Sequence, residues 1–227
     1  MYRLATLALA PLLYFQGSSA RRSIPRLPEP PGERQGSTGS GPRLRLLVFG
    51  DSAAAGVGAA HQDEALLGRL VEALSVNFTV EWHLVANTGA TTASALVHLQ
   101  SLEAGPFDIA ITSLGVNDVT AGITTKLWLA QQAELRETLR TRFGVAHLIV
   151  SGLPPLHGFP ALPQPLRWYL GSKAQEFDQD LRRALDAADG VWFLSLRFTE
   201  DARLMAADAF HPGPEVYREW ARRASVI

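Results

Sequence analysis

Residues 44–58, LRLLVFGDSAAAGVG, carry the pattern that decides the fold. An apolar run, broken only by Arg45, ends abruptly at Gly50. A run of this kind bounded by glycine indicates a strand that is buried on both faces. Ser52 follows at the carboxyl end of that strand, where open α/β sheets place their ligands. We therefore expect the Ser52 hydroxyl at the start of the next helix, in the position of a nucleophile.

Three known glycine-rich motifs fail on this segment. A phosphate-binding loop ends in Gly-Lys-Ser/Thr, but Val57 follows Gly56 here. The dinucleotide-binding fingerprint, G-x-G-x-x-G, would start at Gly56, but His61 stands in place of its third glycine. The G-x-S-x-G elbow fails because Ala54 replaces its last glycine. On this segment alone, the remaining alternative is an ordinary strand, turn and helix with an aspartate or serine cap.

Length and composition bound the class of protein. The chain has 227 residues, enough for one α/β domain with a tail and a sizeable core. Its net charge of −1 gives no global electrostatic basis for binding nucleic acid. Residues 1–43 carry six Arg and two Glu, a net +4, which leaves fifteen Lys or Arg against twenty Asp or Glu, a net −5. We therefore expect a basic tail and a mildly acidic body. The absence of cysteine excludes disulfides, thiol catalysis and cysteine-ligated zinc.

The N-terminus has the plan of a secretory signal peptide. One arginine precedes an apolar stretch at 4–15, and small residues follow at 18–20. The stretch is too short for an ordinary membrane-spanning helix. Arg21 and Arg22 would also suit an uncleaved anchor lying on a membrane surface. We expect residues 1–20 to direct export to the periplasm or the exterior, or to associate the protein with a membrane; a disordered terminus is the alternative.

Residues 21–42 differ in composition from the rest of the chain. They consist mainly of Pro, Gly and Ser with little to bury, which predicts a flexible linker. From residue 43 to residue 227 the pattern becomes regular, and we expect a single folded domain there.

Strand-like runs alternate with helical patterns throughout this domain. The strand-like runs lie at 44–49, 78–86, 107–114, 145–151 and 191–196. The helical patterns lie at about 62–76, 92–102, 124–142 and 168–189, and a last helix follows Pro214. This alternation predicts an α/β protein with a doubly wound parallel sheet of about five strands between layers of helices.

Four of the five strand-like runs end in residues suited to chemistry, and the fourth run is followed by a Pro-rich segment at 152–165. Gly89 follows the second run, Asn117 lies in a GVND motif after the third, and Asp208 and His211 lie in a DAFHP motif after the fifth. In a parallel sheet these residues would converge with Ser52 on one edge. Taken singly, each also fits a turn residue, a helix cap or a surface histidine. Together they supply every part of an acyl-transfer site.

The ordered motifs resemble those of the SGNH (GDSL-like) hydrolases over about residues 44–217. They are GDS at 50–52, Gly89, GVND at 115–118 and DAFHP at 208–212. The resemblance implies a flavodoxin-like three-layer α/β/α sandwich, a hydrolase domain at 43–227, and esterase or lipase activity. Ala53 replaces the leucine of the GDSL motif, at a position with no chemical part. No lid insertion is recognisable, which argues against lipase activity at an interface.

Ser52, His211 and Asp208 have complementary chemical roles. A serine nucleophile needs an adjacent base, and His211 can take the seryl proton and return it to the leaving alcohol. Asp208, three residues earlier, can accept the other imidazole N–H, fix the tautomer and stabilise the imidazolium. The resemblance assigns the oxyanion hole to the backbone N–H groups of Ser52 and Gly89 and to the amide of Asn117. A glycine there would leave room for close approach of the intermediate to the backbone.

Other residues are assigned to structure, among them Trp220, whose helical spacing predicts a place in the core. Asp51 and Asp118 are assigned to turn capping, and the histidines show no metal-ligand spacing with carboxylates, so the expected chemistry uses no metal or cofactor. His157 is the one further histidine considered for substrate contact. It lies in the loop at 153–168, whose Leu, Phe, Pro and Trp residues predict an apolar wall for a small acyl group or a hydrophobic alcohol. The same loop could simply cover the sheet edge.

These observations predict a serine esterase or acylhydrolase. It would cleave small-molecule carboxylic esters, with short acyl chains, through an acyl-enzyme on Ser52. Alternative substrates are O-acetylated carbohydrates, lysophospholipids and thioesters. The alternative from another class is a non-catalytic binding module held on membranes by the basic tail. Such a module would be expected to have lost a catalytic residue, and none is missing.

Overall fold

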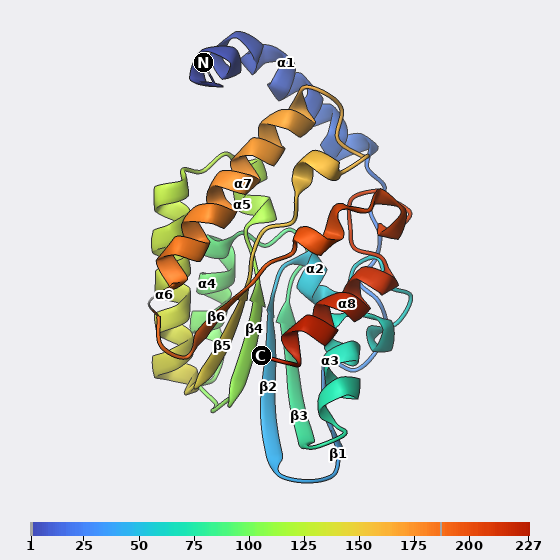
Figure 1. Ribbon diagram of the computed structural model, residues 1–227, viewed down its shortest axis with the longest axis vertical. Helices are drawn as coiled ribbons and strands as arrows, with labels where there is room; N and C mark the ends of the chain where they lie inside the picture. Colours follow the sequence, from blue (N-terminus) through green and yellow to red (C-terminus); the bar gives the residue numbers. More distant parts are fainter. Residues whose placement is uncertain (1, 187) are drawn as a thin grey trace.

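The protein is built on a mixed six-stranded sheet. The computed structural model describes residues 2–186 and 188–227. The strands are β1 (Gln35–Gly39), β2 (Arg43–Gly50), β3 (Thr79–Ala86), β4 (Ile109–Ser113), β5 (His147–Ser151) and β6 (Val191–Leu194). Their order in the sheet is β1-β3-β2-β4-β5-β6 (Figure 1). Only β1 is antiparallel to its neighbour. The five predicted parallel strands are therefore confirmed, with one antiparallel edge strand in addition.

Helices cover both faces of this sheet, as predicted for a three-layer α/β/α sandwich. Helices α3 (Leu66–Leu74) and α8 (Pro214–Ala224) lie on one face, and α4 (Thr92–Ser101), α6 (Thr125–Phe143) and α7 (Leu166–Leu185) lie on the other (Figure 1). Two short helices, α2 (Ser52–Ala55) and α5 (Val116–Ala121), follow β2 and β4. Short 3-10 turns lie at Gln62–Glu64, Leu156–Gly158, Arg197–Glu200 and Ala202–Leu204.

The apolar run of β2 contributes to both cores. Leu47 and Phe49 pack with the helices α4, α6 and α7. Leu46 and Val48 pack with α3 and α8 on the opposite face. Successive side chains of a strand point to opposite faces, so a strand between two helical layers must be apolar at nearly every position.

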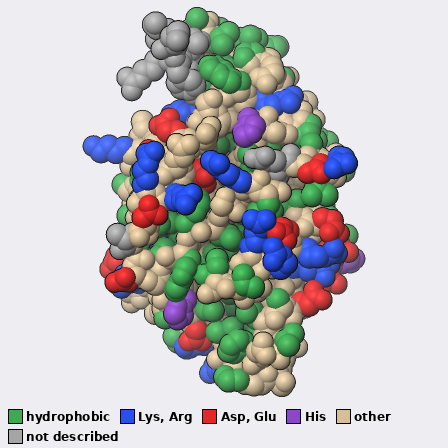
Figure 2. Space-filling view, viewed as in Figure 1, with side chains coloured by type: hydrophobic (Ala, Val, Ile, Leu, Met, Phe, Trp, Pro, Cys, Tyr) green, Lys and Arg blue, Asp and Glu red, His purple; other side chains and the backbone are tan. Residues whose placement is uncertain are grey.

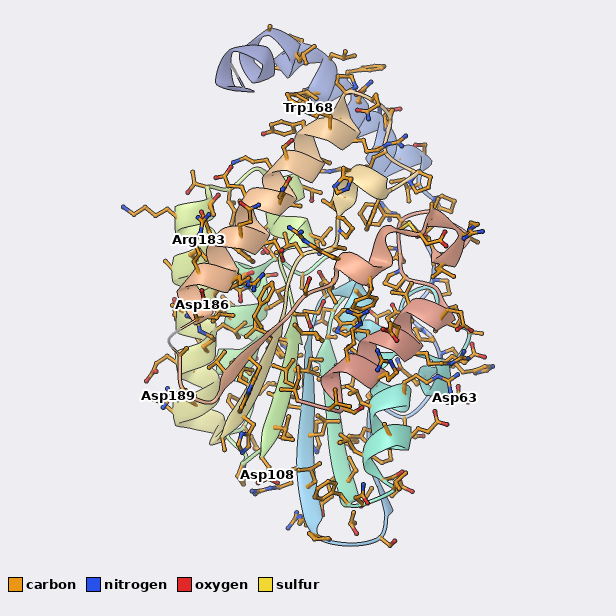
Figure 3. All side chains as sticks on the ribbon, in the orientation of Figure 1. Asp63, Asp108, Trp168, Arg183, Asp186 and Asp189 are labelled. Atoms are coloured by element: carbon orange, nitrogen blue, oxygen red, sulfur yellow. The ribbon has the colours of Figure 1, made fainter. Side chains whose placement is uncertain are left out.

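Arg45, the one polar residue within this run, is paired at the end of the sheet remote from Gly50. Its guanidinium donates to both carboxylate oxygens of Asp108, at 3.1 and 2.6 Å, and its backbone N–H donates to the same carboxylate at 2.8 Å. Asp108 directly precedes β4 and lies at the lower border of the sheet in Figure 3. The pair therefore joins neighbouring strands at the amino ends of both.

Residues 21–42, predicted as a flexible linker, contain the edge strand β1. It pairs with residues 79–83 of β3. All five residues of β1 are exposed, so backbone hydrogen bonds rather than burial hold this strand in place. A strand with nothing to bury shows no alternation of apolar and polar residues, which is why the sequence pattern missed it. The domain boundaries at 20 and 42 stay predictions.

The N-terminal segment forms helix α1 (Tyr2–Ser23), which packs against α7. Among the side chains of this helix that the structure describes, Leu13 and Ala20 are buried. In the part of the chain that the structure describes, none of the helices combines the length and apolarity needed to cross a bilayer. The role of residues 1–20 as an export signal or surface anchor stays a prediction.

Polar contacts also fix α1 to the loops at the carboxyl edge of the sheet. The Gln16 side chain donates to the Gln164 carbonyl at 2.8 Å and accepts the Leu166 N–H at 3.1 Å. Arg21 donates to the carbonyl of Thr120, at the end of α5, at 3.0 Å. The helix is thus tied to the beginning of α7 and to the end of α5.

Charges of both signs are interleaved on the surface. Figure 2 shows basic and acidic side chains mixed over the visible face. On α8, Arg218 pairs with Glu215, and Arg222 and Arg223 both pair with Glu219. This mixing is consistent with the small net charge and leaves no field of a single sign on this helix.

The strand order locates the binding edge. From β2 the chain adds β3 on one side, and later adds β4, β5 and β6 on the other, so the winding reverses between β2 and β4. Ligands of doubly wound sheets bind at this reversal, outside the carboxyl ends of the strands. Ser52 and Asn117 follow the two strands that flank it.

Candidate active site

Ser52 is presented by a tight strand-turn-helix junction. It is the first residue of α2, and the Asp51 carboxylate caps this helix by accepting the Ala53 N–H at 3.0 Å. Gly56 ends the helix after one turn with φ of +91°, a conformation that favours glycine. Ser52 is the first residue of this helix. Its backbone N–H therefore has no carbonyl acceptor within the helix and points outward.

The side chains of Ser52, His211 and Asp208 lie within hydrogen-bond distance in series. Ser52 Oγ is 3.0 Å from His211 Nε2, and His211 Nδ1 is 2.5 Å from Asp208 Oδ2. The second oxygen, Asp208 Oδ1, accepts the backbone N–H groups of Phe210 at 3.0 Å and His211 at 2.9 Å. Ala209, which lies between Asp208 and His211 in the sequence, adopts φ of +55°. The resulting turn places the Asp208 carboxylate next to the imidazole.

The Asp208 carboxylate is stabilised in its ionised form. Burial acts to raise its pKa, but hydrogen bonds from the His211 ring and from the backbone N–H groups of His211 and Phe210 outweigh burial, and the pKa lies below its usual value. Asp208 is therefore ionised at neutral pH, the state needed to accept the imidazole N–H.

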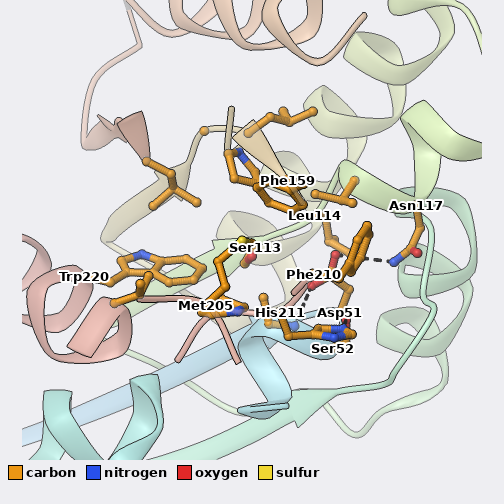
Figure 4. A pocket seen from close by; sticks show the side chains of 18 residues that line it. Asp51, Ser52, Ser113, Leu114, Asn117, Phe159, Met205, Phe210, His211 and Trp220 are labelled. Carbon is orange, nitrogen blue, oxygen red and sulfur yellow. Dashed lines mark hydrogen bonds between the residues drawn. The ribbon is translucent and has the colours of Figure 1, made fainter. Parts of the chain in front are cut away.

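Asn117 lies on the first turn of α5 with its amide close to this group. Its Nδ2 donates to the Ala90 carbonyl at 3.0 Å. The same atom makes a longer contact, 3.4 Å, with Asp51 Oδ2 (Figure 4). One N–H of the amide is therefore well bonded, and the second has only a weak acceptor.

Gly89 follows β3 in a turn with φ of +83°. A Cβ built at this position would meet no atom within 4 Å. The left-handed backbone conformation by itself favours a glycine here, and the expected close approach of the intermediate to this backbone stays a prediction. Gly89 lines a separate hollow beside α4 and is not among the residues lining the cavity next to Ser52.

A small apolar cavity opens beside the Ser52 hydroxyl. Its volume is about 60 Å³. Figure 4 shows Ser52 and His211 together on its wall, with Trp220 and Asn117 toward opposite ends of the view. The loop at 153–168, predicted to form an apolar wall, contributes Leu153, Pro154 and Phe159 to the lining. His157 is not among the lining residues. The rest of the lining includes Leu114, Val116, Leu196, Met205, Phe210, Val216 and Trp220.

Two aromatic residues of this lining were not predicted as site residues. Phe210 packs edge-on against the His211 ring, with centroids 5.3 Å apart, and against Phe159 at 5.4 Å. Its place between Asp208 and His211 in the sequence was an available signal. Trp220 was assigned to the core by its helical spacing; it is buried, its indole N–H donates to Ser151 Oγ at 3.2 Å, and it also lines the cavity.

Asp51 is the most perturbed acid of the site. The carboxyl is fully buried behind Ser52, and burial raises its pKa to about 7, against the opposing effect of the Ala53 N–H and the nearby His211. Among the described residues, no group of three or more His, Asp or Glu is placed to hold a metal ion.

Comparison with known proteins gives consistent matches. The model of a family described as GDSL-like Lipase/Acylhydrolase matches residues 48–219. The GDSL-like esterase Rv1075c of Mycobacterium tuberculosis is 28% identical over 228 residues, covering 91% of this chain and 72% of that protein. A solved member of the lipolytic G-D-S-L family from Veillonella parvula has a TM-score of 0.65 at 13% identity, covering 81% of this chain and 97% of its own. A carbohydrate acetylesterase family member from Sinorhizobium meliloti has a TM-score of 0.61 at 18% identity, covering 81% and 96%. The two solved structures share the fold.

Proposed function

The chain belongs to the GDSL-like lipase/acylhydrolase family, and on that premise we propose that it hydrolyses carboxylic esters through an acyl-enzyme formed on Ser52. The observation that carries the proposal is the series of contacts from Ser52 Oγ through the His211 ring to the buried Asp208 carboxylate, at 3.0 and 2.5 Å. A hydroxyl, a base and an orienting acid in this order form the arrangement that activates a serine nucleophile.

The reaction follows from the contacts of these side chains. His211 Nε2 takes the proton of Ser52 Oγ as the oxygen attacks the ester carbonyl carbon, and Asp208 stabilises the resulting imidazolium. The tetrahedral intermediate collapses, the C–O bond to the alcohol breaks, and His211 returns the proton to the leaving oxygen. A water molecule then attacks the acyl-enzyme with the same base, which releases the acid and restores Ser52.

The negative oxygen of the intermediate needs hydrogen-bond donors. We assign this role to the N–H groups of Ser52 and Gly89 and to Asn117 Nδ2. The Ser52 N–H has no acceptor within the helix because Ser52 is the first helical residue. One N–H of the Asn117 amide has only the 3.4 Å contact with Asp51 as a competing acceptor. Each such donor contributes on the order of 10²–10³ to the rate.

The cavity favours a short acyl group. A volume of about 60 Å³ with mainly apolar lining suits a few carbon atoms and not a long chain. The solved neighbour titled as a carbohydrate acetylesterase makes an acetylated sugar a second substrate to test. Lysophospholipid and thioester substrates complete the set of alternatives.

The test is a substrate panel run on the wild type and two variants. We expect hydrolysis of p-nitrophenyl acetate and butyrate to exceed that of the octanoate and palmitate esters. Acetylated xylose, a lysophosphatidylcholine and an acyl-coenzyme A extend the panel to the alternatives. Ser52→Ala is expected to lose activity by on the order of 10⁴–10⁶, whereas Ser225→Ala, at a serine remote from the site, retains it.

Labelling separates an esterase from a binding module. A fluorophosphonate forms a covalent bond with an activated serine, so intact-mass analysis is expected to show one adduct on the wild type and none on Ser52→Ala. Ester hydrolysis that survives unchanged in Ser52→Ala, or a wild type that takes no label and cleaves no ester, would contradict the proposal.

A further inference from the structure

A buried polar cluster lies beneath the candidate oxyanion hole, and the sequence assigned only its carboxylate, Asp118, to turn capping. Asp118 is 1% exposed, and its carboxylate bonds to Thr92. The Thr92 N–H lies 3.0 Å from both carboxylate oxygens, and Thr92 Oγ1 lies 2.9 Å from Asp118 Oδ2. The contact joins residues 26 positions apart in the chain, so Asp118 bonds to a second element as well as to its own backbone N–H.

The remaining contacts of Thr92 fix the direction of this hydrogen bond. Thr92 Oγ1 accepts Trp128 Nε1–H at 3.1 Å and Gln132 Nε2–H at 3.1 Å, both from α6. A hydroxyl has one proton and two acceptor positions, and both acceptor positions are filled. The hydroxyl proton must therefore point to Asp118. Burial raises the pKa of the Asp118 carboxyl, and the bonds from Thr92 oppose this rise because they favour the carboxylate.

The cluster links the two loops that carry candidate oxyanion donors. Thr92 begins α4 directly after the turn that contains Gly89, and Asp118 follows Asn117 on α5. A second contact, from Asn117 Nδ2 to the Ala90 carbonyl, joins the same two loops nearer the surface. The loops after β3 and β4 are thus bonded to each other at two depths.

We propose that Asp118 is a positioning residue that sets the distance between the Gly89 turn and the Asn117 amide, and so aligns the oxyanion hole. The proposal rests on the proposed function and adds to it a residue that acts through Asn117. Oxyanion donors act at about 2.7–3.1 Å from the developing charge, and a misplacement of about 1 Å can cost on the order of 10² in rate.

The amide substitution is the sharpest test of this role. Asp118→Asn keeps the shape of the side chain but places an N–H₂ group opposite the Thr92 N–H in either orientation of the amide, because that N–H lies 3.0 Å from both carboxylate oxygens. The substitution therefore weakens the bond between the loops. We expect kcat to fall about 10–100-fold and KM to change less than about three-fold, because the hole acts in the transition state and not in substrate binding. The rate of fluorophosphonate labelling is expected to fall with kcat.

Substitutions at Thr92 provide a matched pair. Thr92→Ser retains the hydroxyl and its three bonds, so kcat is expected to stay within about three-fold of the wild type. Thr92→Val has nearly the same shape without the hydroxyl and is expected to lower kcat about ten-fold. This pair keeps the test decisive if Asp118→Asn fails to fold.

A double-mutant cycle separates positioning from simple stabilisation. If Asp118 acts through Asn117, Asp118→Asn lowers kcat by less than about three-fold in an Asn117→Ala background. Full additivity of the two losses would overturn the proposal. A variant that loses thermal stability but keeps the wild-type kcat below its unfolding transition would also overturn it. A wild type that cleaves no ester and takes no label fails the proposed function itself, whereas an active wild type with unaffected variants fails this inference alone.

Discussion

The short contact between His211 Nδ1 and Asp208 Oδ2 defines a first prediction at the residue scale. Asp208→Asn replaces an acceptor with a donor at that contact and so favours the wrong tautomer of the imidazole. We expect kcat for p-nitrophenyl acetate to fall by on the order of 10⁴ with the fold intact. Asp201→Asn is the control, because Asp201 pairs with Arg203 at the surface. A loss of less than about ten-fold in Asp208→Asn would show that Asp208 does not orient the base.

Asp51 gives a prediction about stability and pH. Burial raises its pKa from 3.8 to about 7, so between these values the folded state holds a proton that the unfolded chain has released. The free energy of unfolding therefore falls as the pH rises through this range. At about 1.36 kcal/mol per pKa unit, the loss between pH 5 and pH 8 is about 3 kcal/mol.

Urea unfolding at the two pH values measures this loss. Asp51→Asn cannot ionise, so its free energy of unfolding should decline less than that of the wild type between pH 5 and pH 8. Other buried acids contribute equally to both proteins and cancel in the comparison. Equal declines in the two proteins would mean that Asp51 keeps its ordinary pKa.

The sequence predicted the role of a residue where its hydrogen-bond partner lies nearby in the chain. Asp208 and His211 share one turn, so their spacing of three residues already indicated a hydrogen-bonded pair. Asp118 was assigned to a cap because its partner, Thr92, lies on another element, and no local pattern indicates such a contact. Trp220 was assigned to the core because helical spacing predicts burial but does not show which side chains will be its neighbours.

At the scale of helices and strands, the elements predicted from the sequence are those with a periodic pattern of apolar residues. The strand expected at 44–49 is β2, and the helix expected at 124–142 is α6, each within one residue at its ends. The short helices α2 and α5 are too brief to repeat a 3.6-residue pattern, and β1 buries no side chain. Elements that are too short for a periodic pattern, or that bury no side chain, were therefore missed.

One buried hydroxyl supports the docking of α8 beside the site. Tyr217 is fully buried, and its hydroxyl donates to the Val57 carbonyl, just after α2, at 2.7 Å. Tyr217→Phe leaves that carbonyl without its donor and is expected to lower the free energy of unfolding by about 1–3 kcal/mol. Tyr14→Phe, at an exposed tyrosine, is the control for chemical denaturation. Equal stability of the two variants would exclude this bond as a support of the site.

At the scale of the whole molecule, α1 is expected to behave as a docked element. Leu13 is 8% exposed, whereas its neighbour Leu12 is 43% exposed. Leu13→Ala removes a buried contact worth about 2 kcal/mol and should increase hydrogen exchange of the α1 amides on the order of 10–100-fold. Leu12→Ala should leave that exchange nearly unchanged. Similar exchange in both variants would show that α1 does not dock through Leu13.

The edge strand β1 has a consequence for how copies of the protein behave together. Without it, the eight residues of β3, TVEWHLVA, would offer a long row of unpaired backbone groups to any neighbouring chain. The five-residue segment QGSTG occupies that row and presents only small or polar side chains outward. A short border of this composition is a poor template for fibril growth. We therefore expect residues 35–39 to reduce self-association along this border.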